Sequence, residues 1–159
     1  MNKKSFLDEI TLEVKNLPFL SPVEVEAFNY QILDRKDITY DTEPACRAVV
    51  VIRSMDKTKE FEFFKLAQEA FYFHNKDLRQ VENYYGILDV LNLDQTVFKQ
   101  RFNSAEFKAL VKKDFQRASD LGVNSFPTIL LQIEDQISVL SRGYTTAKSL
   151  DKILKDLDL

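Results

Sequence analysis

Thiol chemistry in this chain depends on Cys46, because it is the only cysteine. Dithiol–disulfide exchange needs a second thiol to release the mixed disulfide that the first thiol forms. This chain therefore cannot complete that exchange alone, nor can it build an internal disulfide framework. Cys46 lies in the first turn of a predicted helix, where the helix dipole favours a reactive thiolate. We favour the alternative, a small buried apolar residue, which is common for a lone cysteine.

Other residues that carry chemistry are sparse. His74 is the only histidine, and nothing near it resembles the turn that presents a catalytic serine, so we interpret it as a helix-end residue. The three glycines lie too far apart for a phosphate-binding loop. Asp89 and Asp94 are interpreted as solvated helix-end charges rather than a general acid–base pair. The sequence thus predicts no catalytic residue, no metal site and no cofactor.

Composition favours a globular domain of ordinary size. The 159 residues include 45% apolar and 30% charged side chains, with 13 phenylalanines to fill a core. A net charge of −3 with interspersed signs offers no basic surface for nucleic acid. Asp8, Glu9 and Glu13 interrupt any signal-peptide core, and no apolar run approaches the ~20 residues of a membrane span. We therefore expect one domain over 1–159, with the cytoplasm as its compartment.

Long helices with short connections follow from having only three glycines and four prolines. Capping patterns and apolar spacing predict helices over about 5–16, 22–33, 43–55, 58–74, 80–91, 94–102, 104–121 and 146–157. The β-branched run within 43–55 also fits a strand, but the start at Thr42-Glu43-Pro44 favours helix. Two short runs, 128–133 and 137–140, predict an antiparallel hairpin. Residues 1–122 should thus be mainly helical, and 123–159 should form a β-β-α unit.

Apolar periodicity also predicts which helix faces are buried. The helix over 58–74 is rich in apolar residues around its circumference, which indicates burial on more than one side. The inward side chains predicted there are Phe61, Phe63, Phe64, Ala67, Ala70, Phe71, Phe73 and His74. For the helix over 104–121 they are Phe107, Leu110, Val111, Phe115 and Ala118.

Three segments and the order of the elements point to a known family. The segments are Tyr40–Val49 (YDTEPACRAV), Gln68–Tyr72 (QEAFY) and Leu121–Thr128 (LGVNSFPT), the last followed by the hairpin, Gly143-Tyr144 and the final helix. Over about residues 40–155 the chain resembles DsbA-family thioredoxin-fold proteins, which include predicted protein-disulfide isomerases. The resemblance implies an α-rich α/β, thioredoxin-like fold with a DsbA-type helical insertion and a C-terminal β-β-α unit.

The resemblance also implies a missing part. Family enzymes carry Cys-x-x-Cys on a strand–helix unit that precedes the helical region, and this sequence has no counterpart. We therefore expect a relative of thiol-disulfide oxidoreductases and isomerases that lacks the N-terminal catalytic βα part and is redox-inactive as this chain. A gene that begins further upstream would instead make the chain a truncated form of an enzyme.

Pro127 matches the cis-proline loop of the family, which offers backbone groups to an extended substrate. The resemblance therefore makes Phe126, Pro127 and Thr128 the candidate substrate-binding residues. The residues alone leave another interpretation open, because only ~5–6% of X–Pro bonds are cis. Pro127 would then be a trans residue at the start of a strand, with Phe126 in the core.

A second hypothesis is a non-enzymatic module that binds a protein or peptide or assembles with itself. Without the central strands of the family, the predicted hairpin keeps an unpaired edge. Exposed edges favour strand addition or pairing with another copy. This hypothesis predicts a homodimer, or a partner that supplies the missing strands.

Overall fold

A computed structural model of the chain describes residues 29, 31–37 and 40–157. The chain divides into two compact units, Met1–Lys112 and Lys113–Leu159. The helix predicted over 5–16 and most of that over 22–33 lie outside the described residues. Within the described part, no helix is long and apolar enough to cross a membrane.

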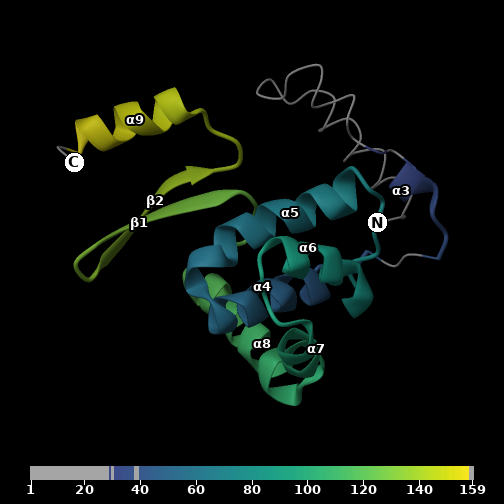
Figure 1. The fold of residues 1–159 in the computed structure, drawn as a ribbon. Coiled ribbons are helices and arrows are strands. Elements are labelled where there is room, and N and C mark those ends of the chain that lie inside the picture. The colour runs from purple at the N-terminus through teal and green to yellow at the C-terminus, as the bar shows by residue number, and fades with distance from the viewer. Residues whose placement is uncertain (1–28, 30, 38–39, 158–159) are drawn as a thin grey trace. The chain divides into compact units, whose positions relative to one another are not determined.

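All secondary-structure elements described in the first unit are helices (Figure 1). Its elements are α3 (Gln31–Asp34), α4 (Glu43–Met55), η1 (Lys57–Lys59), α5 (Glu60–Tyr72), η2 (Val81–Tyr84), α6 (Tyr85–Val90), α7 (Gln95–Asn103) and the first half of α8 (Ala105–Asp120). The helices predicted from 43 to 121 are confirmed, and the strand alternative for 43–55 is wrong.

Side chains cap α4 and α7 where the sequence indicated helix starts. At α4 the side chain that accepts the hydrogen bond belongs to Asp41 rather than to Thr42. Thr42 occupies the N-cap position of α4 but makes no side-chain cap bond. Instead, the amide of Glu43 donates to Asp41 Oδ1 over 3.0 Å. At α7, Asp94 Oδ1 accepts from the amide of Val97 over 2.8 Å. Each bond satisfies a backbone donor that the first turn leaves without an intrahelical partner.

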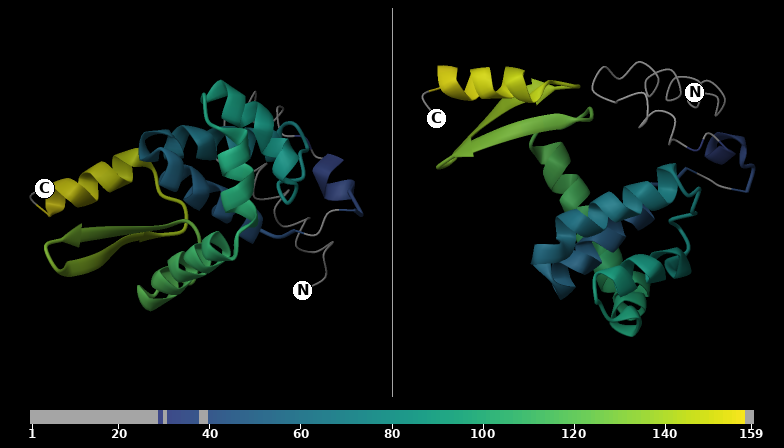
Figure 2. Two further views of the ribbon diagram at one scale, coloured as in Figure 1. Left: turned by 60° about the horizontal axis from the view of Figure 1, so that its bottom comes forward. Right: turned by 45° about the horizontal axis from the view of Figure 1, so that its top comes forward.

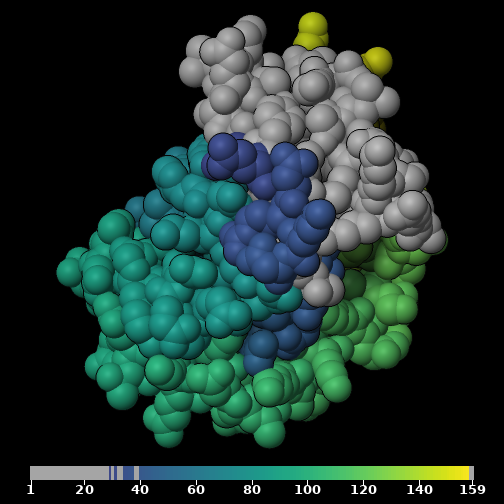
Figure 3. Space-filling model, turned by 90° about the vertical axis from the view of Figure 1, so that its right-hand side faces the viewer, coloured from purple at the N-terminus to yellow at the C-terminus, as the bar shows by residue number. Residues whose placement is uncertain are grey.

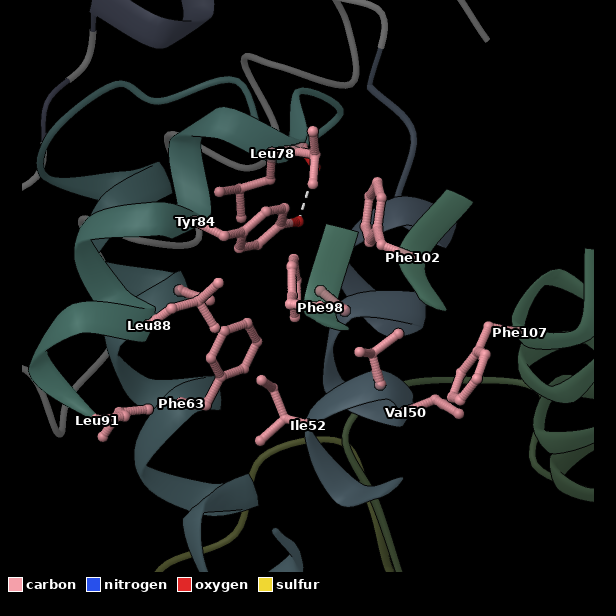
Figure 4. Close-up of a cluster of buried hydrophobic side chains, with 14 of the residues drawn as sticks. Val50, Ile52, Phe63, Leu78, Tyr84, Leu88, Leu91, Phe98, Phe102 and Phe107 are labelled. Atoms are coloured by element: carbon pink, nitrogen blue, oxygen red, sulfur yellow. Dashed lines mark hydrogen bonds between the residues drawn. The ribbon is translucent and has the colours of Figure 1, made fainter. Parts of the chain in front are cut away.

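An aromatic cluster fills the core of the first unit (Figure 4). Phe98 lies at its centre, with ring centroids 6.1 Å from Phe63, 5.5 Å from Tyr84 and 5.7 Å from Phe102. Tyr84 is fully buried, and its hydroxyl donates to the carbonyl of Leu78 over 2.7 Å. Burial raises the pKa of Tyr84, so this hydroxyl stays a donor even in alkaline solution, where an exposed tyrosine would ionise. The cluster brings α5, η2 and α7 into contact.

Burial of α5 on more than one side is not observed. Phe63, Ala67 and Ala70 form one buried stripe at i, i+4 and i+7. Phe61 and Phe64 lie on the flanks of that stripe and are 82% and 44% exposed. Phe73 and His74, which follow α5, were also predicted to point inward and are exposed. The same is true of Phe115 in α8. The sequence prediction failed because apolar residues on both flanks made the true inward stripe ambiguous.

Arg47 is a buried cation that links α4 to α7. Its Nη1 donates to the carbonyl of Phe102 over 3.0 Å, and its Nη2 lies 3.0 Å from Glu43 Oε2. The guanidinium carbon also lies 4.4 Å from the centroid of the Phe102 ring. The carbonyl of Phe102 belongs to the last turn of α7, where carbonyls lack intrahelical partners and cations are favourable. This gives a structural reason for the charged residues within Tyr40–Val49.

Two arginines and two aspartates join the segment after α3 to the segment after α5. Arg35 pairs with Asp37 and donates to the carbonyl of Asn75 over 2.9 Å. Arg79 pairs with Asp77 and donates to the carbonyl of Asp37 over 2.9 Å. In Figure 3 the purple-blue residues of the first segment lie against the teal surface of the first unit.

Acid is expected to loosen this junction without unfolding the helical core. The hydrogen bond from Arg35 lowers the pKa of Asp37 from 3.8 to about 2, so the ionised form is favoured by the folded state. The stabilisation is complete above pH 3.8 and is lost as the pH falls toward 2. NMR titration of the Asp37 carboxyl carbon should show this low midpoint, and an Asp37→Asn variant should lack the transition. A midpoint near 3.8 would contradict the observed pairing.

The second unit contains a hairpin and a helix. Its elements are β1 (Thr128–Ile133), β2 (Gln136–Arg142) and α9 (Ala147–Asp156), which follow the end of α8. The strands pair antiparallel from Thr128↔Arg142 to Ile133↔Gln136, and β2 has one extra residue opposite Ile129/Leu130. The predicted hairpin and final helix are confirmed, and α9 lies alongside the hairpin (Figures 1 and 2).

Burial differs sharply between the two units. Every buried apolar side chain in the described residues lies between Pro44 and Val111. The described residues from 113 onward are all at least partly exposed. The hairpin therefore has a regular backbone without a buried core of its own.

Candidate functional site

The candidate site is a loop that begins where α8 ends. The amide of Gly122 donates to the carbonyl of Ser119 over 2.9 Å, and that of Val123 donates to Ala118 over 3.0 Å. These two bonds are a Schellman motif, which needs a residue with positive φ. Gly122 supplies it with φ 71°. The predicted helix stop is confirmed, and it turns the chain toward β1.

Four hydrogen bonds from the start and end of the hairpin hold this loop. Arg142 Nη1 donates to the carbonyl of Gly122 and to Asn124 Oδ1, both over 3.1 Å. Thr128 Oγ1 donates to the carbonyl of Ser125 over 2.7 Å. The amide of Gly143 donates to the carbonyl of Pro127 over 2.8 Å. The loop is therefore fixed by side chains as well as by its backbone.

The tip of the loop places the three predicted binding residues side by side. The peptide bond between Phe126 and Pro127 is cis. Phe126 is 84% exposed and Pro127 is exposed, while Thr128 is half-buried. Phe126 is therefore not a core residue, contrary to the alternative interpretation of the sequence. Within the described part of the chain, no hydrogen bond engages the backbone N–H or C=O of Phe126.

Cys46 belongs to the helical unit. It is the fourth residue of α4, it is half-buried, and it packs against the hydrophobic core. Its amide donates to the carbonyl of Thr42 over 3.0 Å. His74 follows the end of α5 and is exposed. The described residues contain no group of three or more His, Cys, Asp or Glu side chains placed to hold a metal ion.

The supporting residues of the loop were not found from the sequence. Arg142 and Asn124 are separated by 18 positions, and nothing in their spacing indicates contact. The pairing of Thr128 with Arg142 brings the arginine back to the start of β1. Correct register of the hairpin would have been the only sequence signal for this contact. Chemically, the arrangement leaves backbone groups and an aromatic ring open to solvent, and the loop itself contains no thiol.

Comparison with known proteins places this geometry in a family. The profile of the thioredoxin family matches residues 27–147. A proposed protein disulfide isomerase from Nitrosomonas europaea is 22% identical, with a TM-score of 0.76, and the match covers 98% of this chain and 92% of that one. No curated protein matches the chain.

The cytosolic disulfide reductase DsbM from Pseudomonas aeruginosa is also similar in structure. One structure of it is 16% identical with a TM-score of 0.63, covering 91% of this chain and 78% of that one. Its structure with GSH is 18% identical with a TM-score of 0.62, covering 80% and 64%. The fold is thus one shared with disulfide reductases and isomerases. The chain belongs to the thioredoxin family and has the DsbA-like, α-rich thioredoxin fold that its sequence indicated.

Proposed function

We propose that this chain binds an extended stretch of polypeptide at Phe126–Thr128 and does not catalyse dithiol–disulfide exchange by itself. The observation that carries the proposal is the loop tip, where the backbone of Phe126 has no hydrogen-bond partner among the described residues. A strand-like ligand satisfies such groups through main-chain hydrogen bonds, whatever its sequence.

The ring of Phe126 supplies the apolar part of the proposed contact. At 84% exposure it can bury most of its surface against a ligand, and aromatic side chains contribute strongly to binding when they become desolvated. The hydrogen bonds from Arg142, Thr128 and Gly143 order the loop beforehand. Less conformational entropy is then lost on binding.

The single thiol limits the proposed function to binding. If Cys46 attacked a disulfide, it would form a mixed disulfide and release one thiolate of the target. Release of that adduct within the chain requires a second thiol, and the sequence has only one. A cytoplasmic location is part of the same proposal, supported by the cytosolic reductase among its structural neighbours.

Replacement of Phe126 with alanine is expected to weaken peptide binding about tenfold, in the range of a loss of ~1.4 kcal/mol. The probe is insulin B chain with its cysteines carboxamidomethylated, so that only non-covalent binding is measured. Isothermal titration gives the dissociation constant, and ¹⁵N spectra should show the largest amide shifts at Phe126 and Thr128.

Phe61→Ala is the matched control, because Phe61 is 82% exposed on α5 and lies in the first unit. It should leave the dissociation constant unchanged. Equal losses in the two variants, or amide shifts confined to residues before 113, would reject the loop as the binding site.

A further inference from the structure

We propose that two copies of this chain pair through the outer edges of β1, antiparallel and centred on Leu130, to form a four-stranded sheet. The inference goes beyond peptide binding at the loop, and the two proposals share the backbone of Thr128, so that a peptide and a second copy would compete for it. It rests on the register of the hairpin, on the charge of β1 and on the exposure of the second unit.

The register identifies which backbone groups face outward. The amide of Gly143 donates to the carbonyl of Pro127, so these two residues form a hydrogen-bonded position of the ladder. The next pair, Thr128 and Arg142, is therefore a non-hydrogen-bonded pair. Residues with this property alternate along a strand. Thr128, Leu130 and Gln132 therefore direct their N–H and C=O groups away from β2. Among the described residues, these outward backbone N–H and C=O groups have no hydrogen-bond partner, although the side chains of Thr128 and Gln132 donate to the carbonyls of Ser125 and Glu134.

This edge is complementary to itself. An antiparallel copy centred on Leu130 places Leu130 opposite its own counterpart and Thr128 opposite Gln132 of the second copy. Three such pairs would each exchange two backbone hydrogen bonds. β1 contains no charged residue and no internal proline, which are the usual protections of an exposed edge. The extra residue of the bulge lies in β2, so the ladder of β1 stays regular while that of β2 is interrupted.

Charges beyond the strand are also complementary in this register. The hairpin turn carries Glu134 and Asp135. Antiparallel pairing about Leu130 brings Glu134 of one copy opposite Phe126 of the other, next to the strand end that carries Arg142. The acidic turn of one copy thus lies across β1 from Arg142 at the end of β2 of the other copy, on both sides of the two-fold axis. Such pairing steers association and fixes register more than it adds affinity.

The exposure of the second unit explains why pairing is favourable. A two-stranded hairpin is marginally stable in water, and three or more strands are usually needed. Several apolar side chains of this unit are exposed: Ile133, Ile137, Val139 and Tyr144. A second copy doubles the number of strands and gives the open edge of β1 its partner.

The oligomeric state of the full chain tests the proposal directly. Light scattering is expected to give a mass near twice 18.5 kDa, falling toward 18.5 kDa on dilution. Leu130→Lys and Leu130→Glu should each be monomeric, because the two-fold axis places like charges opposite each other. Mixing these two variants should restore the dimeric mass. Ile137→Lys, a change in β2 on the far side of the hairpin from the proposed edge, should remain dimeric.

A cysteine variant provides a second measurement that adds no charge. In a Cys46→Ser background, mild oxidation should link Leu130→Cys chains in pairs and leave Ile137→Cys chains unlinked. The proposal is overturned if the unmodified chain is monomeric at every concentration. It is equally overturned if the mixed charge variants stay monomeric, or if both cysteine variants are linked alike. None of these results involves peptide binding, so they are independent of the Phe126→Ala experiment.

Discussion

Replacing Phe98 with alanine is expected to lower the free energy of unfolding of the helical unit by about 3–5 kcal/mol. Phe98 is fully buried, and its ring contacts those of Phe63, Tyr84 and Phe102. Truncation removes these ring contacts and leaves a cavity that the surrounding side chains fill only partly. Because the three partners come from α5, η2 and α7, the loss affects several elements at once.

Urea denaturation followed by far-ultraviolet circular dichroism measures this loss. Phe61→Ala is the matched control, since it deletes the same side chain at an 82% exposed position of α5 and should change stability by no more than about 0.5 kcal/mol. Tyr84→Phe should fall between them, because it keeps the ring but leaves the carbonyl of Leu78 without its 2.7 Å donor. Similar losses for Phe98→Ala and Phe61→Ala would mean that the aromatic cluster is not the core.

Local signals in the sequence predicted the elements of this fold well. The helices over 94–102 and 104–121 were predicted with nearly their observed ends, and the structure shows Asp94 capping α7 and Gly122 following the end of α8. The hairpin followed from two β-branched runs separated by a short polar turn. These predictions needed no knowledge of tertiary contacts.

Contacts between distant residues were beyond sequence reasoning. Arg47 reaches a carbonyl 55 positions away, and Arg142 reaches one 20 positions away. Neither contact leaves a periodic pattern, because each depends on how complete elements pack. The inward stripe of α5 was missed for a related reason: Phe61, Phe63 and Phe64 are equally apolar, and only the position of α7 decides which is buried.

The candidate site was identified from the family resemblance together with contacts that only the structure shows. Phe126–Thr128 was selected by resemblance to a family, and the residues alone left open a trans bond with Phe126 in the core. The structure gives the loop a physical basis in the hydrogen bonds of Arg142, Thr128 and Gly143. These bonds hold an exposed aromatic residue whose backbone makes no hydrogen bond within the described part of the chain. The resemblance located the loop, and its supporting contacts make it a candidate for binding.

Reduction of insulin by dithiothreitol is expected to proceed no faster with this chain than without it. Turnover requires a thiolate that attacks the insulin disulfide and a second thiol that displaces the resulting mixed disulfide. Cys46 could supply only the first step, and it is half-buried against the helical core. Its amide already donates to the carbonyl of Thr42, the N-cap residue of α4, so it is not one of the unpaired donors that stabilise an anion at a helix start.

Cys46→Ser is the matched control, because serine replaces the thiol with a group of similar size that cannot enter disulfide exchange. Insulin precipitation should show equal rates for the original chain, the serine variant and dithiothreitol alone. A rate above that of dithiothreitol that the serine variant loses would show that one thiol suffices when an external reductant resolves the adduct. An excess rate that persists in Cys46→Ser would point away from thiol chemistry, since no other cysteine is present. Equal rates, together with peptide binding that depends on Phe126, would show that this chain binds peptides without catalysing disulfide exchange.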